Sequence, residues 1–135
     1  MTGTPLPSTG NLKRTWRWYR SPGSDRVVAR EDMLSLPEHG RAALMEAIGR
    51  FRHGEERPRE VKKLQDCKGL WEIRVQVEGD AFRALFFYDL GPVCVCVTAI
   101  QKNQQRLPKP DRERALERMA TWQEEGRQRR KDPPT

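Results

Sequence analysis

Three runs of strand-forming residues, separated by two short turn signals, constrain the fold of this chain more than any other feature. Leu70–Val77 alternates apolar with polar side chains, and Phe82–Tyr88 and Val93–Ile100 are rich in β-branched and aromatic residues. Glu78-Gly79-Asp80 is a hairpin signal, and Asp89-Leu90-Gly91-Pro92 separates the second run from the third. The sequence therefore predicts a three-stranded antiparallel meander.

Helical patterns precede and follow this meander. Residues 13–20 predict one earlier strand, because tryptophan alternates there with arginine. The predicted helices cover residues 25–34, 35–54 and 110–126. Ser35 and Glu38 form a capping box for the second helix, and glycines end the last two. Gly40 and Gly49 either weaken the second helix or let it pack closely. The order strand, helix, helix, meander and C-terminal helix predicts an α+β domain with helices on one face of a small sheet.

The composition indicates one basic domain. The chain has 135 residues and a formal net charge of +7, which favours an acidic partner such as nucleic acid. We expect a flexible N-terminal tail over residues 1–11, a folded domain over 12–126 and a basic, flexible tail over 127–135. The sequence has no apolar run near the roughly 18 residues of a membrane span and no apolar core of a signal peptide at its start. A cytoplasmic protein is therefore expected.

The three cysteines, Cys67, Cys94 and Cys96, do not have the spacing of a metal site. They are predicted to be small buried hydrophobic residues. We expect neither a metal ion nor another cofactor.

The pairing register of the meander determines which polar side chains share a face. Either two-residue loop that the hairpin signal allows places Arg74 and Arg83 on the same face. A four-residue loop after the second run would set Tyr88 opposite Val93. The face of the two arginines would then carry Glu72, Arg74, Gln76, Arg83, Leu85, Phe87, Cys94, Cys96 and Lys102. Two arginines so close either bind an anion or are neutralised by neighbouring acids, and the register does not distinguish these alternatives.

A polar segment follows the last strand. Gln101–Arg106 contains two cations, three glutamines and an asparagine, with no apolar residue. It is either a solvated loop or a site for a polyanion with exposed bases. The connector Glu55–Lys68 is also highly charged, and for most of it a solvated loop is the simpler interpretation.

Motifs in and around the meander occur in a characteristic order. They are Lys63-Leu64, Gly69–Arg74, Phe82–Phe87 and Ala99–Lys109, followed by Ala115 and Arg118. In this order they resemble the RelE/HigB superfamily of bacterial toxins, most of all its phage-derived HigB-like branch. The resemblance covers roughly Trp16–Trp122 and implies a RelE-like arrangement of the predicted elements.

The resemblance implies the toxin of a type II toxin–antitoxin system, a ribosome-dependent endoribonuclease that cleaves messenger RNA and so inhibits translation. The chemistry that it implies is attack of a ribose 2′-hydroxyl on the adjacent phosphate. The catalytic residues implied by position are Arg74, Arg83 and Lys102, and Glu72 is added to them because it offers a carboxylate base. Arg83 is the candidate for phosphate stabilisation. The implied RNA-binding residues are Lys62, Lys63, Gln104, Arg106 and Lys109.

The partners implied by the resemblance are a cognate helix-turn-helix, HigA-like antitoxin, messenger RNA and the ribosome. Neither His39 nor His53 lies on the strands that carry the implied catalytic residues, so the general base is not assigned. Two alternatives stay open: a ParE-like gyrase inhibitor of the same fold, and a non-catalytic RNA-binding protein. The cationic face favours the nuclease, because a gyrase inhibitor needs no phosphate site.

Overall fold

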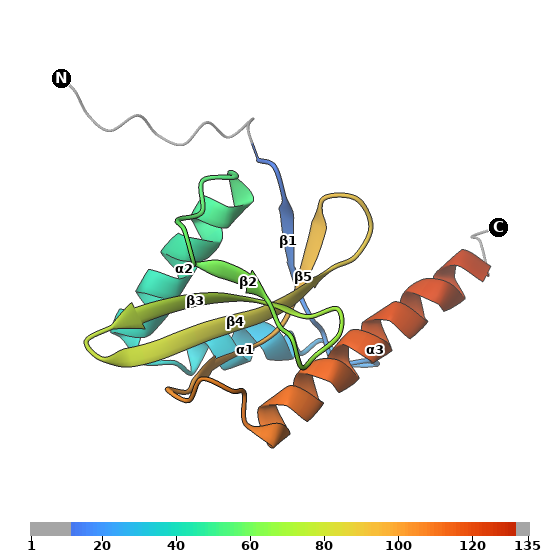
Figure 1. Ribbon diagram of the computed structural model, residues 1–135. Coiled ribbons are helices and arrows are strands. Elements are labelled where there is room, and N and C mark those ends of the chain that lie inside the picture. The colour runs from blue at the N-terminus through green and yellow to red at the C-terminus, as the bar shows by residue number, and fades with distance from the viewer. Residues whose placement is uncertain (1–11, 132–135) are drawn as a thin grey trace.

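The structure, a computed structural model, describes residues 12–131 as a mixed sheet with helices (Figure 1). In chain order the elements are β1 (Thr15–Trp18), α1 (Val28–Leu34), α2 (Glu38–Arg52), β2 (Val61–Lys63), β3 (Trp71–Val77), β4 (Asp80–Tyr88), β5 (Val93–Gln101) and α3 (Lys109–Lys131). The predicted tail at residues 1–11 and the last residues of the second tail, 132–135, lie outside the described residues.

The strands form one sheet in the order β1-β5-β4-β3-β2. The antiparallel pairing of β3, β4 and β5 confirms the predicted meander. β1 pairs parallel with β5, and β2 pairs antiparallel with β3. The sequence did not predict β2, because its short run lies in a charged connector and contains two lysines. β1 and β2 are thus the two edges of the sheet.

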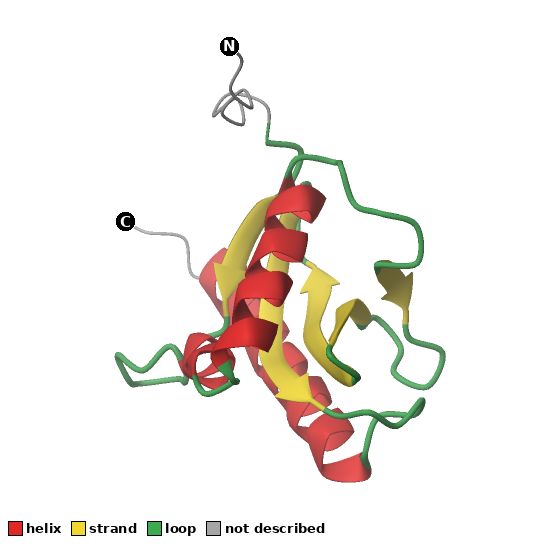
Figure 2. Ribbon diagram, turned by 90° about the vertical axis from the view of Figure 1, so that its left-hand side faces the viewer, coloured by secondary structure: helices red, strands yellow, loops and turns green. Residues whose placement is uncertain are grey.

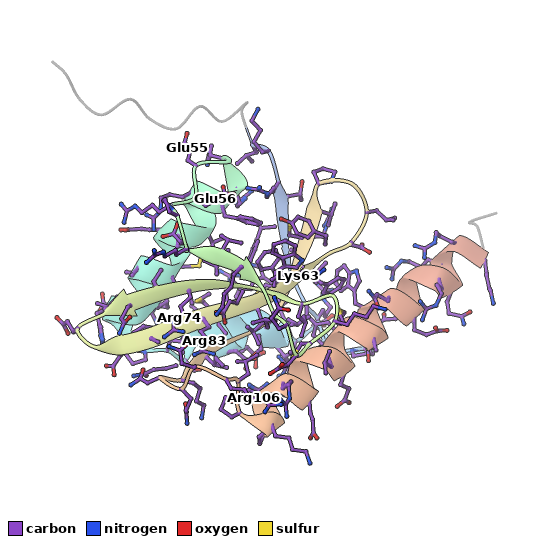
Figure 3. The ribbon with its side chains drawn as sticks, viewed as in Figure 1. Glu55, Glu56, Lys63, Arg74, Arg83 and Arg106 are labelled. Atoms are coloured by element: carbon purple, nitrogen blue, oxygen red, sulfur yellow. The ribbon has the colours of Figure 1, made fainter. Side chains whose placement is uncertain are left out.

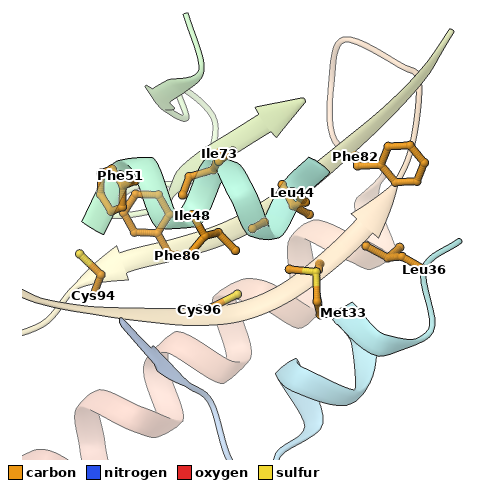
Figure 4. Packing of buried hydrophobic residues seen from close by; sticks show 13 residues of the cluster. Met33, Leu36, Leu44, Ile48, Phe51, Ile73, Phe82, Phe86, Cys94 and Cys96 are labelled. Carbon is orange, nitrogen blue, oxygen red and sulfur yellow. The ribbon is translucent and has the colours of Figure 1, made fainter. Parts of the chain in front are cut away.

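Helices cover both faces of the sheet, so the expectation of helices on one face is wrong. On β4, Phe82 and Phe86 belong to a hydrophobic cluster with α2, whereas Leu85 and Phe87 belong to a second cluster with α3. Alternate side chains of a strand point to opposite faces, so the two helices lie on opposite sides of the sheet (Figure 2). Figure 4 shows the buried side chains that α2 contributes to the first cluster, among them Leu44, Ile48 and Phe51.

A polar junction fixes α1 and α3 against β5. The carboxylate of Asp32 in α1 accepts a hydrogen bond from the Thr98 hydroxyl and one from Nη1 of Arg118, each at 2.7 Å. Nη1 of Arg118 also lies 2.8 Å from the carbonyl oxygen of Val97. Because Arg118 lies near the middle of α3, this junction fixes that part of the helix against the sheet.

β5 departs from the predicted register. Tyr88 pairs with Cys94 and not with Val93, so the first residues of β5 face the side opposite to the predicted one. A β-bulge at Val97 then shifts the register, and the residues from Thr98 onward lie on their predicted faces. Cys94 and Cys96 therefore pack in the cluster under α2. Their expected place on the face of Arg83 is wrong.

The three cysteines are free and buried, as predicted for small hydrophobic residues. Burial raises the pKa of each thiol, and that of Cys94 reaches about 11. All three are therefore protonated at neutral pH and are poor nucleophiles.

Three predicted helix ends are wrong. α1 begins at Val28 and not at residue 25. Pro37 is the N-cap of α2 and no side chain caps this end, while the Ser35 hydroxyl donates to the carbonyl oxygen of Asp32 at 2.7 Å. α3 continues through Gly126, so the described part of the predicted C-terminal tail is helical. The end of α2 agrees with the prediction, since Gly54 follows its C-cap with a φ of +72°.

The two glycines inside α2 have different environments. A Cβ at Gly40 would lie 2.2 Å from ring atoms of Phe82, so the absence of a side chain lets α2 approach β4. A Cβ at Gly49 would meet no atom within 4 Å. Close packing is therefore the explanation for Gly40 only.

Candidate nucleic-acid interface

Arg74 and Arg83 lie directly opposite each other on β3 and β4 (Figure 3). The hairpin loop is Glu78-Gly79, one of the two loops that the sequence allows, and both of its residues have positive φ. The arginines do share a face, as predicted. Their exposure differs, because Arg74 is half-buried whereas only 1% of the Arg83 side chain is exposed.

Arg83 forms a buried ion pair with Glu72. Its Nη1 lies 3.8 Å from Oε2 of Glu72, whose side chain is also 1% exposed, and Nζ of Lys62 lies 3.6 Å from the other carboxylate oxygen. Burial lowers the pKa of Arg83, while the charge of Glu72 opposes this shift and that of Arg74 adds to it. Within the described part of the chain neither carboxylate oxygen has a hydrogen-bond partner. Of the two alternatives for the arginines, neutralisation by an acid therefore holds for Arg83.

The loop after β5 covers this ion pair. Nη2 of Arg83 donates a hydrogen bond to the main-chain carbonyl of Gln104. The main-chain N–H of Lys102 donates to the carbonyl oxygen of Ala81 at 3.2 Å, and the side-chain oxygen of Asn103 accepts the N–H of Ala81 at 2.7 Å. These contacts hold the polar segment over the end of the sheet with its side chains exposed.

A cleft of about 580 Å³ lies between this loop and the connection from β2 to β3. Four cationic side chains line it: Lys62, Lys63, Arg106 and Arg112. The carboxylate among its lining residues is Asp66, whose Oδ2 lies 3.0 Å from Nε of Arg106. Glutamine side chains from both walls complete the polar lining. Excess positive charge together with amides suits the phosphates and base edges of an RNA strand.

The structure brings together part of each predicted set. Of the catalytic candidates, Glu72 and Arg83 are in contact but buried, Lys102 is exposed, and Arg74 lines a separate pocket. Of the RNA-binding candidates, Lys62, Lys63 and Arg106 line the cleft, Gln104 borders a shallow depression with Lys102, and Lys109 is exposed and 3.8 Å from Glu113.

Sequence reasoning missed three residues of the cleft, Asp66, Gln105 and Arg112. Asp66 lies in the connector for which a solvated loop was the simpler interpretation, and Gln105 lies in the polar segment for which a solvated loop and a polyanion site were both open. Arg112 lies in the first turn of α3, and the sequence alone does not show that this helix passes the loop between β2 and β3. The sequence did contain a signal for the cleft. The connector before the first strand of the meander and the segment after its last strand are both polar, and both flank strands of one predicted sheet.

Neither histidine lies in the cleft. His39 packs edge-on against Phe82 with ring centroids 5.5 Å apart, and Nδ1 of His53 lies 2.9 Å from the carbonyl oxygen of Gly49. Among residues 12–131 no three His, Cys, Asp or Glu side chains are grouped so as to hold a metal ion. No helix in the same range is long and apolar enough to cross a membrane.

Residues 31–120, more than half of the chain, match the family of phage-derived Gp49-like proteins (DUF891). The chain belongs to this family. Two curated relatives, from different strains of Mycobacterium tuberculosis, are both named probable endoribonuclease HigB1. Each is 33% identical to this Gp49-like chain over 108 residues, which cover 80% of the chain and 84% of the relative. The HigB-like branch predicted from the motifs is thereby confirmed.

The matched part of the Gp49-like chain contains the whole cleft. It runs from α1 into α3 and includes β2, the connection to β3, the loop after β5 and Arg112. The family resemblance and the cationic surface therefore concern the same region of the molecule.

Proposed function

We propose that this chain is the toxin of a type II toxin–antitoxin pair, a ribosome-dependent endoribonuclease that cleaves messenger RNA in the cytoplasm. The observation that carries the proposal is the cationic cleft between the β2–β3 connection and the loop after β5. The name of the HigB1 relatives, probable endoribonuclease, supports the same activity. A gyrase inhibitor would need no phosphate-binding cleft, so the nuclease is preferred.

In the proposed reaction the RNA strand supplies its own nucleophile. The ribose 2′-oxygen forms a bond to the adjacent phosphorus while the bond from phosphorus to the 5′-oxygen breaks, leaving a 2′,3′-cyclic phosphate and a free 5′-hydroxyl. The protein must accept the proton of the 2′-hydroxyl, supply one to the 5′-oxygen, and neutralise the added charge on the phosphorane. A message already held in the ribosome needs less orientation from the protein than free RNA does.

The exposed side chains of the cleft fit these tasks. Lys63 and Arg106 are exposed cations on opposite walls and would hold the phosphate between them. Asp66 is a carboxylate that faces the cleft, and we assign it as proton acceptor in place of the buried Glu72. Lys102 does not line the cleft but is exposed at the start of the same loop, in the depression that it borders with Gln104, and it is the candidate proton donor.

Arg83 and Glu72 would act as positioning residues. A direct contact between RNA and either side chain would require the loop after β5 to move away, since both are covered. In the present arrangement Arg83 holds the loop through the carbonyl of Gln104, and Glu72 holds Lys62 at the side of the cleft. Both act through the residues that would touch RNA.

The proposed protein partner is a cognate helix-turn-helix antitoxin. A segment of it rich in acids, laid over the cleft, would neutralise the exposed cations and exclude RNA. Association driven by such charges is fast and slows as salt rises. An association rate indifferent to ionic strength, measured by stopped-flow mixing, would contradict this binding mode.

The proposed activity is tested by inducing the chain without an antitoxin in a bacterial host and mapping RNA ends. We expect growth arrest with messages cut to 2′,3′-cyclic phosphate and 5′-hydroxyl ends. Purified protein should cleave a message bound to ribosomes far faster than the same message free in solution. Lys63→Ala combined with Arg106→Ala should slow cleavage about a hundredfold or more, and Asp66→Asn should slow it while retaining RNA affinity.

Arg127→Ala is the matched control, because Arg127 is an exposed arginine near the end of α3 that pairs with Glu124. It should cleave as the wild type does. Arrested replication with intact messages would instead indicate a gyrase inhibitor. Full cleavage by the Lys63 and Arg106 double variant would show that the cleft is not the site.

A further inference from the structure

The turn before β2 holds an arginine in a strained backbone conformation. Arg59 has a φ of +67°, in the left-handed region that favours glycine. Such a conformation persists in other residues only where the surroundings impose it, and it is concentrated at binding sites. Contacts of the turn must therefore hold Arg59 in this conformation.

Glu60 holds the turn. Its buried carboxylate accepts hydrogen bonds from Nε and Nη2 of Arg50 at 3.0 and 2.6 Å and from the main-chain N–H of Arg57 at 3.2 Å. Its carbonyl oxygen accepts the N–H of Arg74 at 2.8 Å. The turn is thus tied to α2 on one side and to β3 on the other. Arg57 and Arg59 are held in place while their side chains remain exposed.

A pocket of about 310 Å³ lies where this turn, just before the start of β2, meets the later part of β3. Arg57, Arg59 and Arg74 line it, and in residues 12–131 none of the three has an ion-pair partner. The acids among the lining residues are Glu60, which is paired with Arg50, and Glu46. The pocket, called here the arginine pocket, therefore has positive charge in excess.

We infer that the arginine pocket binds a backbone phosphate of the same RNA strand whose cleaved phosphate lies in the cleft. This inference rests on the proposed function. A guanidinium binds two phosphate oxygens at once, and a rigid turn loses little entropy on binding. Lys62 and Lys63 follow the turn directly on edge strand β2 and also line the cleft. Arg59 and Lys62 are three positions apart in the sequence, which is at most roughly 10 Å even for a fully extended chain, so a few nucleotides reach both sites.

The arrangement also assigns a role to Arg74. The resemblance implied a catalytic role for it, but although Arg74 does lie opposite Arg83, it lines the arginine pocket and not the cleft. It would therefore position the RNA strand rather than act at the cleaved phosphate. Like Arg57 and Arg59, it should affect binding of long RNA more than the chemistry.

The test measures binding of a labelled twelve-nucleotide single-stranded RNA by fluorescence anisotropy over a range of salt. Arg57→Ala combined with Arg59→Ala should weaken binding about tenfold at low salt. It should also reduce the slope of log affinity against log salt by about 0.7 for each phosphate contact that is lost. The charge-matched control is Arg26→Ala combined with Arg127→Ala, since both arginines are exposed and paired with glutamates. The control should leave the slope nearly unchanged.

Arg59→Gly separates binding from stability. Glycine relieves the positive φ, so this variant should have a higher unfolding midpoint than the wild type and yet bind the twelve-nucleotide RNA more weakly. A merely structural arginine would not weaken binding when the fold is stabilised. Unchanged RNA affinity and salt slope in both pocket variants would overturn the inference, as would an equal loss in the control.

The outcome is distinguishable from failure of the proposed function. If the wild type cleaves ribosome-bound message and the pocket variants bind RNA normally, the inference alone is wrong. If the wild type does not cleave but the pocket variants lose affinity and salt slope, the pocket binds RNA and the assigned reaction is wrong.

Discussion

Removing the buried cation Arg83 should destabilise the fold severely. Both Arg83 and Glu72 are about 1% exposed, and no described group donates a hydrogen bond to the Glu72 carboxylate. Arg83→Met would leave that carboxylate buried with Lys62, at 3.6 Å, as its remaining cation. Breaking a buried pair in this way costs about 3–5 kcal/mol, a large share of the roughly 5–15 kcal/mol of a typical domain. The thermal midpoint should fall by about 10 °C or more.

Removing both charges should cost much less than removing one. In the double variant Arg83→Met with Glu72→Leu, similar volumes stay buried and no charge is left without a partner. Urea unfolding of the wild type, both single variants and the double variant gives the coupling between the two side chains. We expect at least about 2 kcal/mol of coupling. If the double variant loses as much free energy of unfolding as the two single variants together, Arg83 and Glu72 are not coupled by their charges.

Three further predictions concern stability and reactivity. Gly49→Ala should raise the free energy of unfolding by about 1 kcal/mol, whereas Gly40→Ala should lower it because of the clash with Phe82, both measured by urea unfolding. Burial acts to raise the pKa of Glu60, but hydrogen bonds from Arg50 and from main chain in the turn outweigh it, so the pKa lies below its ordinary value. Its contribution to stability should be present above about pH 4.3 and be lost as pH falls through the folded pKa, and Glu60→Gln should remove that acid-sensitive part. The native protein should not react with a thiol reagent at pH 8, and all three cysteines should react once it is unfolded.

The regular parts of the fold follow from local patterns. Period-two alternation in residues 70–77, a two-residue turn signal and β-branched runs were sufficient for the meander and for placing Arg74 on the same face as Arg83. The second half of α2 also follows from a local pattern, because Leu44, Ile48 and Phe51 recur at the spacing of one helix face. These features depend on neighbours along the chain, which a sequence displays directly.

The errors arose where distant contacts decide the structure. The bulge at Val97 has no local signal, yet it reverses the face of Cys94 and Cys96. α3 passes Gly126 because one glycine in an exposed helix costs only about 1 kcal/mol, too little to stop a helix flanked by charged helix formers. The burial of Arg83 depends on the loop that folds over it, and alternation predicts only the face from which it projects.

The hydrogen bond from Arg83 to position 104 has a consequence for mutagenesis and for comparison with relatives. The acceptor is a main-chain oxygen, which any amino acid would present equally well. Alanine scanning through residues 102–106 would therefore leave this contact intact, and relatives could differ freely at position 104 while keeping the same loop geometry. The side chain that makes this contact belongs to position 83, whereas the second side-chain contact that holds the loop belongs to Asn103. Covariation between positions 83 and 104 should accordingly be absent although they are in contact.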